Sequence, residues 1–154
     1  MMRRLAARGL VVAAATAVAS VGTVAPAEAA TRKVKIVYVQ YDSPGSDRGS
    51  NASLNAEWVT IQNVGRRSKE ITGFTLTDET GYTYTLKTNT LAPGQKVRVR
   101  SGKGTNTRRN KYWGREWYVW NNDSDKATLR DADGDLVDSC AWDNGGGTKD
   151  CYPG

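Results

Sequence analysis

The 154-residue sequence predicts an all-β domain, an antiparallel sandwich or barrel of about eight short strands. Three observations lead to this class. Turns rich in Gly, Asn, Asp and Pro interrupt the chain roughly every 8–15 residues. The segments between these turns alternate apolar with polar residues, and no segment after residue 30 keeps the 3.6-residue apolar period of a helix.

The first 29 residues are expected to be a signal peptide that is cleaved from the domain. Three arginines precede an apolar run over residues 9–25, and Ala27-Glu28-Ala29 places small residues at the two positions that a signal peptidase reads. The apolar run is short and Ala-rich for a membrane span, and no basic anchor follows it directly. A short lead over residues 30–33 comes next. We therefore expect a secreted protein, extracellular or loosely bound at the cell surface, with no integral membrane segment after cleavage.

The expected strands are segments in which β-branched and aromatic residues alternate with polar ones. Val97 and Val99 share one face of residues 96–100, so the residues between and beside them face the other side. The other expected strands are residues 34–41, 57–63, 71–77, 82–86, 117–120, 126–130 and 136–142. The expected core contains Val59, Ile61, Phe74, Leu76, Tyr84, Leu86, Val97, Val99, Ala127 and Leu129.

Both cysteines lie near the C-terminus. In an oxidising compartment, Cys140 and Cys151 most simply pair with each other. The bridge ties the Gly-rich tail over residues 143–154 back to the domain, and the chain-entropy model gives it roughly 2–3 kcal/mol. A metal site built on the two cysteines is the alternative, but the chain has no His and carboxylates would have to complete such a site.

The absence of His also limits catalysis. It removes the usual general base near neutral pH and the Ser-His and Cys-His nucleophile pairs. No nucleophile elbow, P-loop or dinucleotide-binding glycine motif is present. A carboxylate-pair glycosidase is the mechanism that remains, although 16 acidic residues supply carboxylate pairs by chance. We therefore expect no enzymatic activity and no cofactor.

Asp131, Asp133 and Asp135 raise the question of calcium. An EF-hand loop needs its Gly at position six and an acid at position twelve. Counted from Asp131, Gly134 falls at position four and Leu136 at position six, so the pattern fails. Asp and Gly favour tight turns. The segment therefore predicts a hairpin turn and no metal site.

The order of the motifs resembles the lamin tail domain family. Glu57-Trp58-Val59 leads to Asn63, and Ile71-Thr72-Gly73-Phe74-Thr75-Leu76-Thr77-Asp78 and Leu91-Ala92-Pro93-Gly94 follow. Downstream, the sequence is similar to the bacterial branch of the family. That part comprises Tyr112-Trp113-Gly114, Val119-Trp120-Asn121-Asn122 and residues 131–139.

The resemblance covers about residues 34–142 and implies an immunoglobulin-like sandwich. It also implies a role in binding or attachment rather than chemistry. In nuclear lamins this domain is an interaction module on a filament protein, and in bacteria it often accompanies secreted hydrolases. The resemblance does not name the partner or the oligomeric state.

A basic stretch is the leading candidate for a binding surface. On the strand over residues 96–100, the outward side chains are spaced by roughly 7 Å, twice the rise per residue. A basic row beside aromatic groups is typical of surfaces that bind polyanions or single strands. The cations are Lys96, Arg98 and Arg100 on the strand, followed by Lys103, Arg108, Arg109 and Lys111 in a polar loop.

This stretch predicts an extracellular or surface partner, a protein or a polyanion, with nucleic acid as a weaker alternative. Removal of the signal peptide takes away three Arg and one Glu, so the net charge falls from +6 to +4, which permits attraction to polyanions without requiring it. Two structural explanations compete: a solvated outer face is normal for a sandwich strand, and cations also protect an edge strand from aggregation.

Exposed aromatic rings predict a different function, carbohydrate or cell-wall binding. The candidates for stacking on sugars are Trp113, Trp117 and Tyr118. Neighbouring residues of a strand over 117–120 would face opposite ways, so these rings could not all belong to the core. A further alternative is an envelope-associated structural protein without a discrete ligand.

Overall fold

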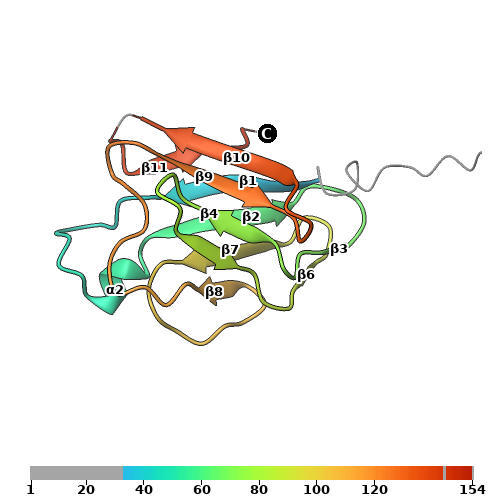
Figure 1. The fold of residues 1–154 in the computed structure, drawn as a ribbon, viewed down its shortest axis with the longest axis horizontal. Coiled ribbons are helices and arrows are strands. Elements are labelled where there is room, and N and C mark those ends of the chain that lie inside the picture. The colour runs from blue at the N-terminus through green and yellow to red at the C-terminus, as the bar shows by residue number, and fades with distance from the viewer. Residues whose placement is uncertain (1–32, 144, 154) are drawn as a thin grey trace, which may run out of the picture.

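The computed structural model describes residues 33–143 and 145–153, and the signal-peptide prediction over residues 1–29 lies outside them. Two β-sheets pack against each other as the layers of a sandwich (Figure 1). The first sheet has the order β11-β1-β2-β7-β8, and the second has the order β10-β9-β4-β5. The fold is the immunoglobulin-like sandwich that the sequence predicts.

The bounds of the elements are as follows. The first sheet contains β1 (Val34–Gln40), β2 (Trp58–Asn63), β7 (Lys96–Arg100), β8 (Asn110–Tyr112) and β11 (Thr148–Asp150). The second contains β4 (Thr75–Thr77), β5 (Thr83–Thr85), β9 (Asp125–Arg130) and β10 (Leu136–Trp142). A small two-stranded sheet pairs β3 (Lys69–Glu70) with β6 (Thr90–Leu91), and the short helix α2 spans Asn51–Leu54.

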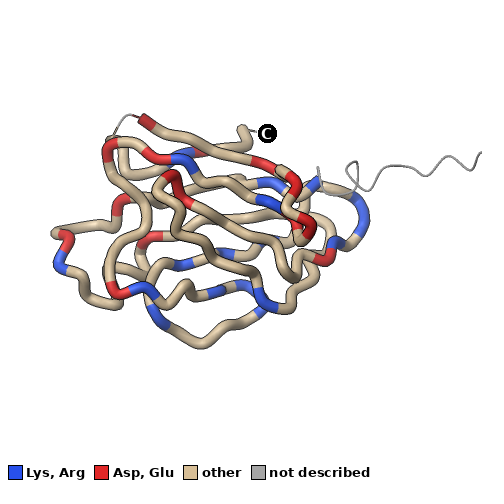
Figure 2. The backbone as a smooth tube through the Cα atoms, in the orientation of Figure 1, with Lys and Arg blue, Asp and Glu red and all other residues tan. Residues whose placement is uncertain are grey.

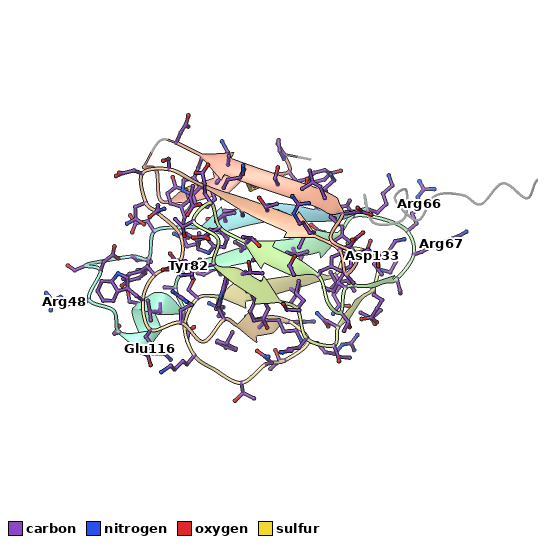
Figure 3. All side chains as sticks on the ribbon, in the orientation of Figure 1. Arg48, Arg66, Arg67, Tyr82, Glu116 and Asp133 are labelled. Carbon is purple, nitrogen blue, oxygen red and sulfur yellow. A yellow bond between two sulfur atoms is a disulfide. The ribbon has the colours of Figure 1, made fainter. Side chains whose placement is uncertain are left out.

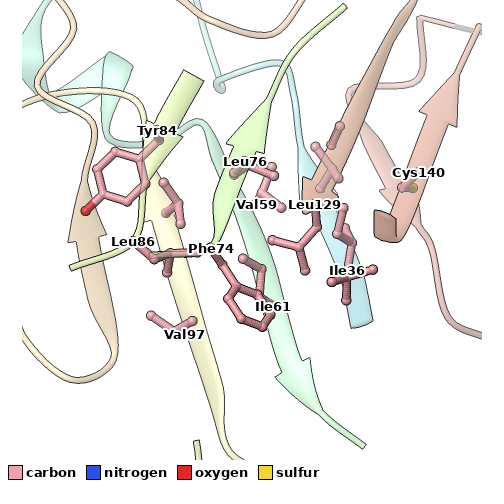
Figure 4. Packing of buried hydrophobic residues seen from close by; sticks show 14 of the residues in the cluster. Ile36, Val59, Ile61, Phe74, Leu76, Tyr84, Leu86, Val97, Leu129 and Cys140 are labelled. Atoms are coloured by element: carbon pink, nitrogen blue, oxygen red, sulfur yellow. The ribbon is translucent and has the colours of Figure 1, made fainter. Parts of the chain in front are cut away.

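The core lies between the two sheets and contains every residue expected there from strand alternation (Figure 4). Val59 of β2 pairs with Val99 of β7, and both are buried. From the second sheet, Leu76 and Leu129 pair with each other and are fully buried as well. Burial of each such aliphatic side chain stabilises the fold by about 1.5–3 kcal/mol. The apolar residues of the alternating strands therefore face inward, which leaves the polar residues of β7 outside.

Three features of the sheets differ from the expectations. Residues 117–120 form no strand, because the backbone N–H groups of Val119 and Trp120 bond to the Glu57 carboxylate instead of to a neighbouring strand. The loop after β7 contains β8, which runs parallel to β7 and is the exception to antiparallel pairing. The C-terminal tail contains β11, which pairs with β1.

The disulfide between Cys140 and Cys151 is present, as predicted. Cys140 lies on β10 of the second sheet, and Cys151 directly follows β11 of the first sheet. The bridge therefore joins the two sheets. None of the helices in the described part of the chain is long and apolar enough to cross a membrane.

Candidate binding face

The candidate face lies on the outside of the first sheet, where β2 and β7 run side by side. Their antiparallel register places Trp58 opposite Arg100, Thr60 opposite Arg98 and Gln62 opposite Lys96. Lys96 and Arg98 are exposed, whereas the two valines between the cations are buried. The alternation thus presents the cations of β7 to solvent on one side of the sheet.

Trp58 organises the two arginines of this face. Its half-buried ring has the guanidinium carbon of Arg98 at 5.2 Å from the ring centroid and that of Arg100 also at 5.2 Å. A cation over an aromatic ring at an exposed site contributes about 0.5–1 kcal/mol. The ring therefore limits the freedom of two long side chains that would otherwise move independently in solvent.

Arg100 has a second role, because it also holds the surrounding backbone. Its Nη1 donates to the carbonyl oxygen of Asn55, and its Nε donates to Oδ1 of Asn110 at 3.0 Å. These bonds connect β7 to the segment after α2 and to β8. Arg100 is thus partly committed within the protein, while Arg98 is exposed.

Two adjoining hollows occupy this face. One, of about 450 Å³, is lined by Val37, Tyr38, Trp58, Thr60, Gln62, Lys96, Arg98, Asp150 and Tyr152. The other, of about 460 Å³, is lined by Gly94, Gln95, Lys96, Arg98, Arg109 and Asn110. Lys96 and Arg98 line both hollows, so the two form one surface. We call the surface formed by Trp58, Lys96, Arg98, Arg100 and Arg109 the β2–β7 face.

Comparison with known proteins places the fold. The family model of the Lamin Tail Domain matches residues 27–144, which is more than half of the chain. The chain belongs to the lamin tail domain family. Lamin tail domains are immunoglobulin-like domains that are often involved in binding and are not typically enzymatic. No curated protein matches the chain.

Two of the predicted cations of this lamin tail domain lie away from the β2–β7 face. Lys111 is only 4% exposed, because it pairs with buried Val99 in the register of β7 and β8. Its Nζ donates to the carbonyl oxygen of Thr88 at 3.4 Å, and burial lowers its pKa. Lys103 forms an ion pair with Glu116 at 2.8 Å. The prediction that Lys111 belongs to the basic surface is wrong because its side chain is buried, whereas Lys103 is exposed and its charge is paired with Glu116.

The remaining loop cations are distributed differently. Arg109 lines a hollow together with Lys96 and Arg98, and its backbone oxygen accepts a bond from the Arg98 N–H at 2.8 Å. Arg108 is exposed, and its carbonyl oxygen accepts a bond from Nδ2 of Asn89. The shared hollow and this backbone bond therefore place Arg109 beside the cations of β7.

The aromatic candidates of the lamin tail domain also separate. Trp113 is half-buried and packs between Tyr84 and Trp120, with ring centroids 5.7 and 5.8 Å away, so its role as a sugar-stacking ring is not supported. Trp117 is 60% exposed and meets Tyr118 edge to face at 5.4 Å. The Tyr118 hydroxyl bonds to Ser53 Oγ at 2.6 Å. Trp117 is thus the exposed ring of the three.

Sequence reasoning missed the role of Glu57, which it placed only within a family motif. The side chain is fully buried, and its two oxygens accept the N–H groups of Val119 at 3.1 Å and Trp120 at 3.0 Å. Burial raises its pKa to about 7, against the lowering effect of Ser101 and of these two N–H groups. The only sequence feature that points to a special role for Glu57 is its place directly before an alternating strand. Glu57 therefore holds the segment that the sequence had predicted as a strand.

The acidic turn after β9 has the predicted hairpin form. Oδ1 of Asp131 accepts the N–H groups of Asp133 at 3.1 Å and Asp135 at 2.9 Å, and Gly134 has a φ of +91° that suits glycine. The carboxylate thus closes its own turn. Among the described residues, no group of three or more His, Cys, Asp and Glu side chains is arranged to hold a metal ion.

Proposed function

We propose that this lamin tail domain is a secreted, non-enzymatic module that binds a linear polyanion through the β2–β7 face. The observation that carries the proposal is the placement of two guanidinium groups over one Trp58 ring, beside Lys96 and Arg109. Arginine forms bidentate bonds with sulfate, phosphate and carboxylate groups. Side chains that are already restricted lose less entropy on binding, which favours a preorganised site.

Three cations of this face have no carboxylate partner among the described residues. In residues 33–143 and 145–153, the ion pairs are Lys35 with Asp138 and Lys103 with Glu116. Lys96, Arg98 and Arg109 have no carboxylate partner in that part of the chain. Figure 2 shows Lys and Arg along the part of the molecule where β7 and β8 lie. An anionic ligand would supply the counter-charges.

Protection of a sheet edge does not account for the two arginines of β7. Cations on an edge strand prevent other chains from pairing with it. However, β7 lies between β2 and β8, and β8 covers the edge of β7 from Arg98 to Arg100. The edge beside it belongs to β8, whose central cation, Lys111, points into the protein. This observation favours a ligand-binding role for the outward cations of β7.

The chemistry of Trp58 favours a ligand recognised by charge over one recognised by nucleobase stacking. Single-stranded nucleic acids bind to aromatic rings whose faces are open. The guanidinium groups of Arg98 and Arg100 already contact the ring of Trp58. A flexible polymer that carries sulfate or phosphate groups therefore fits this face better than bases do.

Export is part of the same proposal. The disulfide between Cys140 and Cys151 is typical of proteins that mature in oxidising compartments. The basic and apolar pattern of residues 1–29 is the second support, because it matches a signal peptide. The test is amino-terminal sequencing of the protein recovered from the culture medium, which should begin near residue 30. Recovery only of intracellular, uncleaved protein would refute export.

Binding of purified protein to heparin at low and near-physiological salt tests the function. We expect affinity to fall steeply with salt, since bound counterions are released when charges pair. The double variant Arg98→Gln/Arg109→Gln should weaken binding about tenfold, at roughly 0.7 kcal/mol for each exposed contact. Arg100 is left unchanged because it bonds to Asn55 and Asn110.

The matched control is the double variant Arg48→Gln/Lys126→Gln, which removes two exposed cations from other elements. Figure 3 shows Arg48 on a loop far along the molecule from Arg66 and Arg67. Equal loss of affinity in both double variants would mean that only net charge matters. That result, or no binding at low salt, would refute the β2–β7 face.

Carbohydrate binding remains a second candidate because Trp117 is 60% exposed. Its ring packs over Gly49, where an added Cβ would lie 2.5 Å from a ring carbon. This close approach fixes one side of the ring and leaves the rest open to solvent. Trp117→Ala should then abolish a salt-insensitive binding to polysaccharide without unfolding the domain. Trp113→Ala is expected to lower stability, because that ring packs against the core.

A further inference from the structure

The turn that follows β2 is fixed by a buried side chain. Asn63 is fully buried; its Nδ2 donates to the carbonyl oxygens of Arg67 at 2.8 Å and Leu91 at 2.9 Å. Its Oδ1 accepts the N–H of Gly65 at 2.9 Å. The N–H of Val64 donates to the carbonyl oxygen of Lys33 at 2.8 Å. The backbone of this turn is therefore tied to the core and to the start of β1.

Gly65 brings a cation close to the turn. A Cβ built at this position would lie 2.9 Å from the Cβ of Lys33 and 3.2 Å from Oδ1 of Asn63. Two side-chain carbons do not approach so closely in real proteins. The aliphatic part of Lys33 therefore packs directly against the backbone of Gly65. The absence of a side chain at residue 65 thus permits Lys33 to join the turn residues.

Four cations surround one hollow at this place. A hollow of about 440 Å³ is lined by Lys33, Val64, Gly65, Arg66, Arg67 and Lys69. We call Lys33, Arg66, Arg67 and Lys69 the turn patch. No acidic residue lines the hollow, and none of the four cations has a carboxylate partner in residues 33–143 and 145–153. Like charges held together without a partner repel one another, and a bound anion would relieve that repulsion.

The turn patch lies at one end of the β2–β7 face. Val34 of β1 pairs with Asn63 of β2, and Lys96 of β7 pairs with Gln62. Lys33 and Lys96 are therefore at the same end of the sheet on strands that flank β2. Two strand spacings of about 4.8 Å separate them laterally by roughly 10 Å. One flexible chain carrying several anionic groups is long enough to reach both places.

We propose that the turn patch is a second oxyanion site, and that one linear polyanion occupies it together with the β2–β7 face. The inference rests on the proposed function for the identity of the polymer. The ligand group is a sulfate ester or a phosphate, because two arginines and two lysines offer forked and single donors to tetrahedral oxyanions.

An acidic turn at the same end restricts the direction of approach. Figure 3 shows Asp133 at the end of the molecule where Arg66 and Arg67 lie. Asp133 belongs to the turn between β9 and β10 of the second sheet. Its negative charge repels a polyanion from the second sheet. The polymer is thereby directed from the turn patch along the first sheet, toward Lys96.

The experiment is an NMR titration of ¹⁵N-labelled protein with a short heparin-derived oligosaccharide. We expect shifts in two separate groups of backbone amides, one over residues 64–69 and one over residues 96–100. The double variant Arg66→Gln/Arg67→Gln should lose the first group of shifts and keep the second. It should fold normally, because Asn63 holds the turn through backbone atoms. A polyphosphate of similar length, titrated in parallel, tells whether phosphate or sulfate binds better.

A longer heparin fragment tests whether one chain occupies both sites. Linking two binding events on one ligand raises the affinity, so the Arg66→Gln/Arg67→Gln variant should bind the long fragment about tenfold more weakly. The control variant Arg48→Gln/Lys126→Gln should lose at most about twofold. The inference is overturned if residues 64–69 show no shifts or if both double variants lose affinity equally.

Failure of the proposed function would give a different result from failure of the turn patch. In that case the amides over residues 96–100 would not shift with any ligand, and Arg98→Gln/Arg109→Gln would bind as tightly as the unmodified protein. Failure of the turn patch alone would leave the shifts over residues 96–100 and the effect of the Arg98→Gln/Arg109→Gln variant in place.

Discussion

Glu57 makes the stability of this domain depend on pH in an unusual direction. Its carboxyl group is buried and has no cationic partner among the described residues, and burial raises its pKa from 4.5 to about 7. Between these two values the folded chain binds the Glu57 proton more tightly than the unfolded chain does. The stabilising contribution is therefore complete below about pH 4.5 and is lost as the pH rises through 7. Most carboxylates in proteins act in the opposite sense.

The variant Glu57→Gln isolates this contribution. Gln is uncharged at every pH and has nearly the same shape, so its stability carries no contribution from titration at residue 57. The pKa difference of the wild-type residue corresponds to roughly 3 kcal/mol, at 1.36 kcal/mol for each pKa unit. The free energy of unfolding of the variant, taken relative to wild type, should therefore rise by roughly 3 kcal/mol between pH 4 and pH 8.

Urea unfolding of both proteins at several pH values measures this difference, because the contributions of all other carboxylates cancel. Glu79→Gln, at an exposed acidic position, is the matched control for the loss of one carboxyl group. A Glu57→Gln difference that stays constant from pH 4 to pH 8 would refute the reasoning. It would mean that the carboxylate is solvated or is held by a cation in solution.

Three further substitutions give separate expectations. Replacing Cys140 and Cys151 together by Ser should lower the free energy of unfolding by about 3 kcal/mol, measured in urea, since the bridge closes a loop between residues 11 positions apart; an unchanged midpoint would contradict it. Trp58→Leu should weaken heparin binding roughly fivefold to thirtyfold, because the two cation–ring contacts contribute about 0.5–1 kcal/mol each. Unaltered affinity in a folded variant would count against the ring's role. Asn63→Ala removes three hydrogen bonds and should lower the free energy of unfolding, measured by thermal unfolding, by about 3 kcal/mol. A decrease below about 1 kcal/mol would mean that the turn does not depend on Asn63.

Strand alternation predicted the parts of the fold that local sequence determines. Val97 and Val99 face the core, and their polar neighbours face solvent, because the side-chain direction in a strand reverses at each residue. The turn at Asp131 was predictable for a similar reason, since its bonds join residues that are close in sequence. Such features need no knowledge of the second sheet.

Long-range partners decided the parts that were not predictable. Lys111 reads as one more cation in a basic loop, yet its pairing with Val99 turns it inward. Residues 117–120 read as an aromatic strand, but the Glu57 carboxylate accepts two of their backbone N–H groups. The sequence around Lys149 does not predict a strand, and the segment is extended because it pairs with the edge of β1. In each case the deciding contact lies on a different element of the fold.

The modest net charge makes the arrangement of the cations decisive for the proposed function. The whole chain carries only +6, which gives weak attraction to any polyanion. Arg98 and Arg100 over one ring, and Arg66 and Arg67 on a fixed turn, hold positive charge at defined places instead of spreading it. Removing two charges from either place should therefore weaken binding far more than removing two charges elsewhere. This contrast between variants of equal net charge separates a built binding surface from general electrostatic attraction.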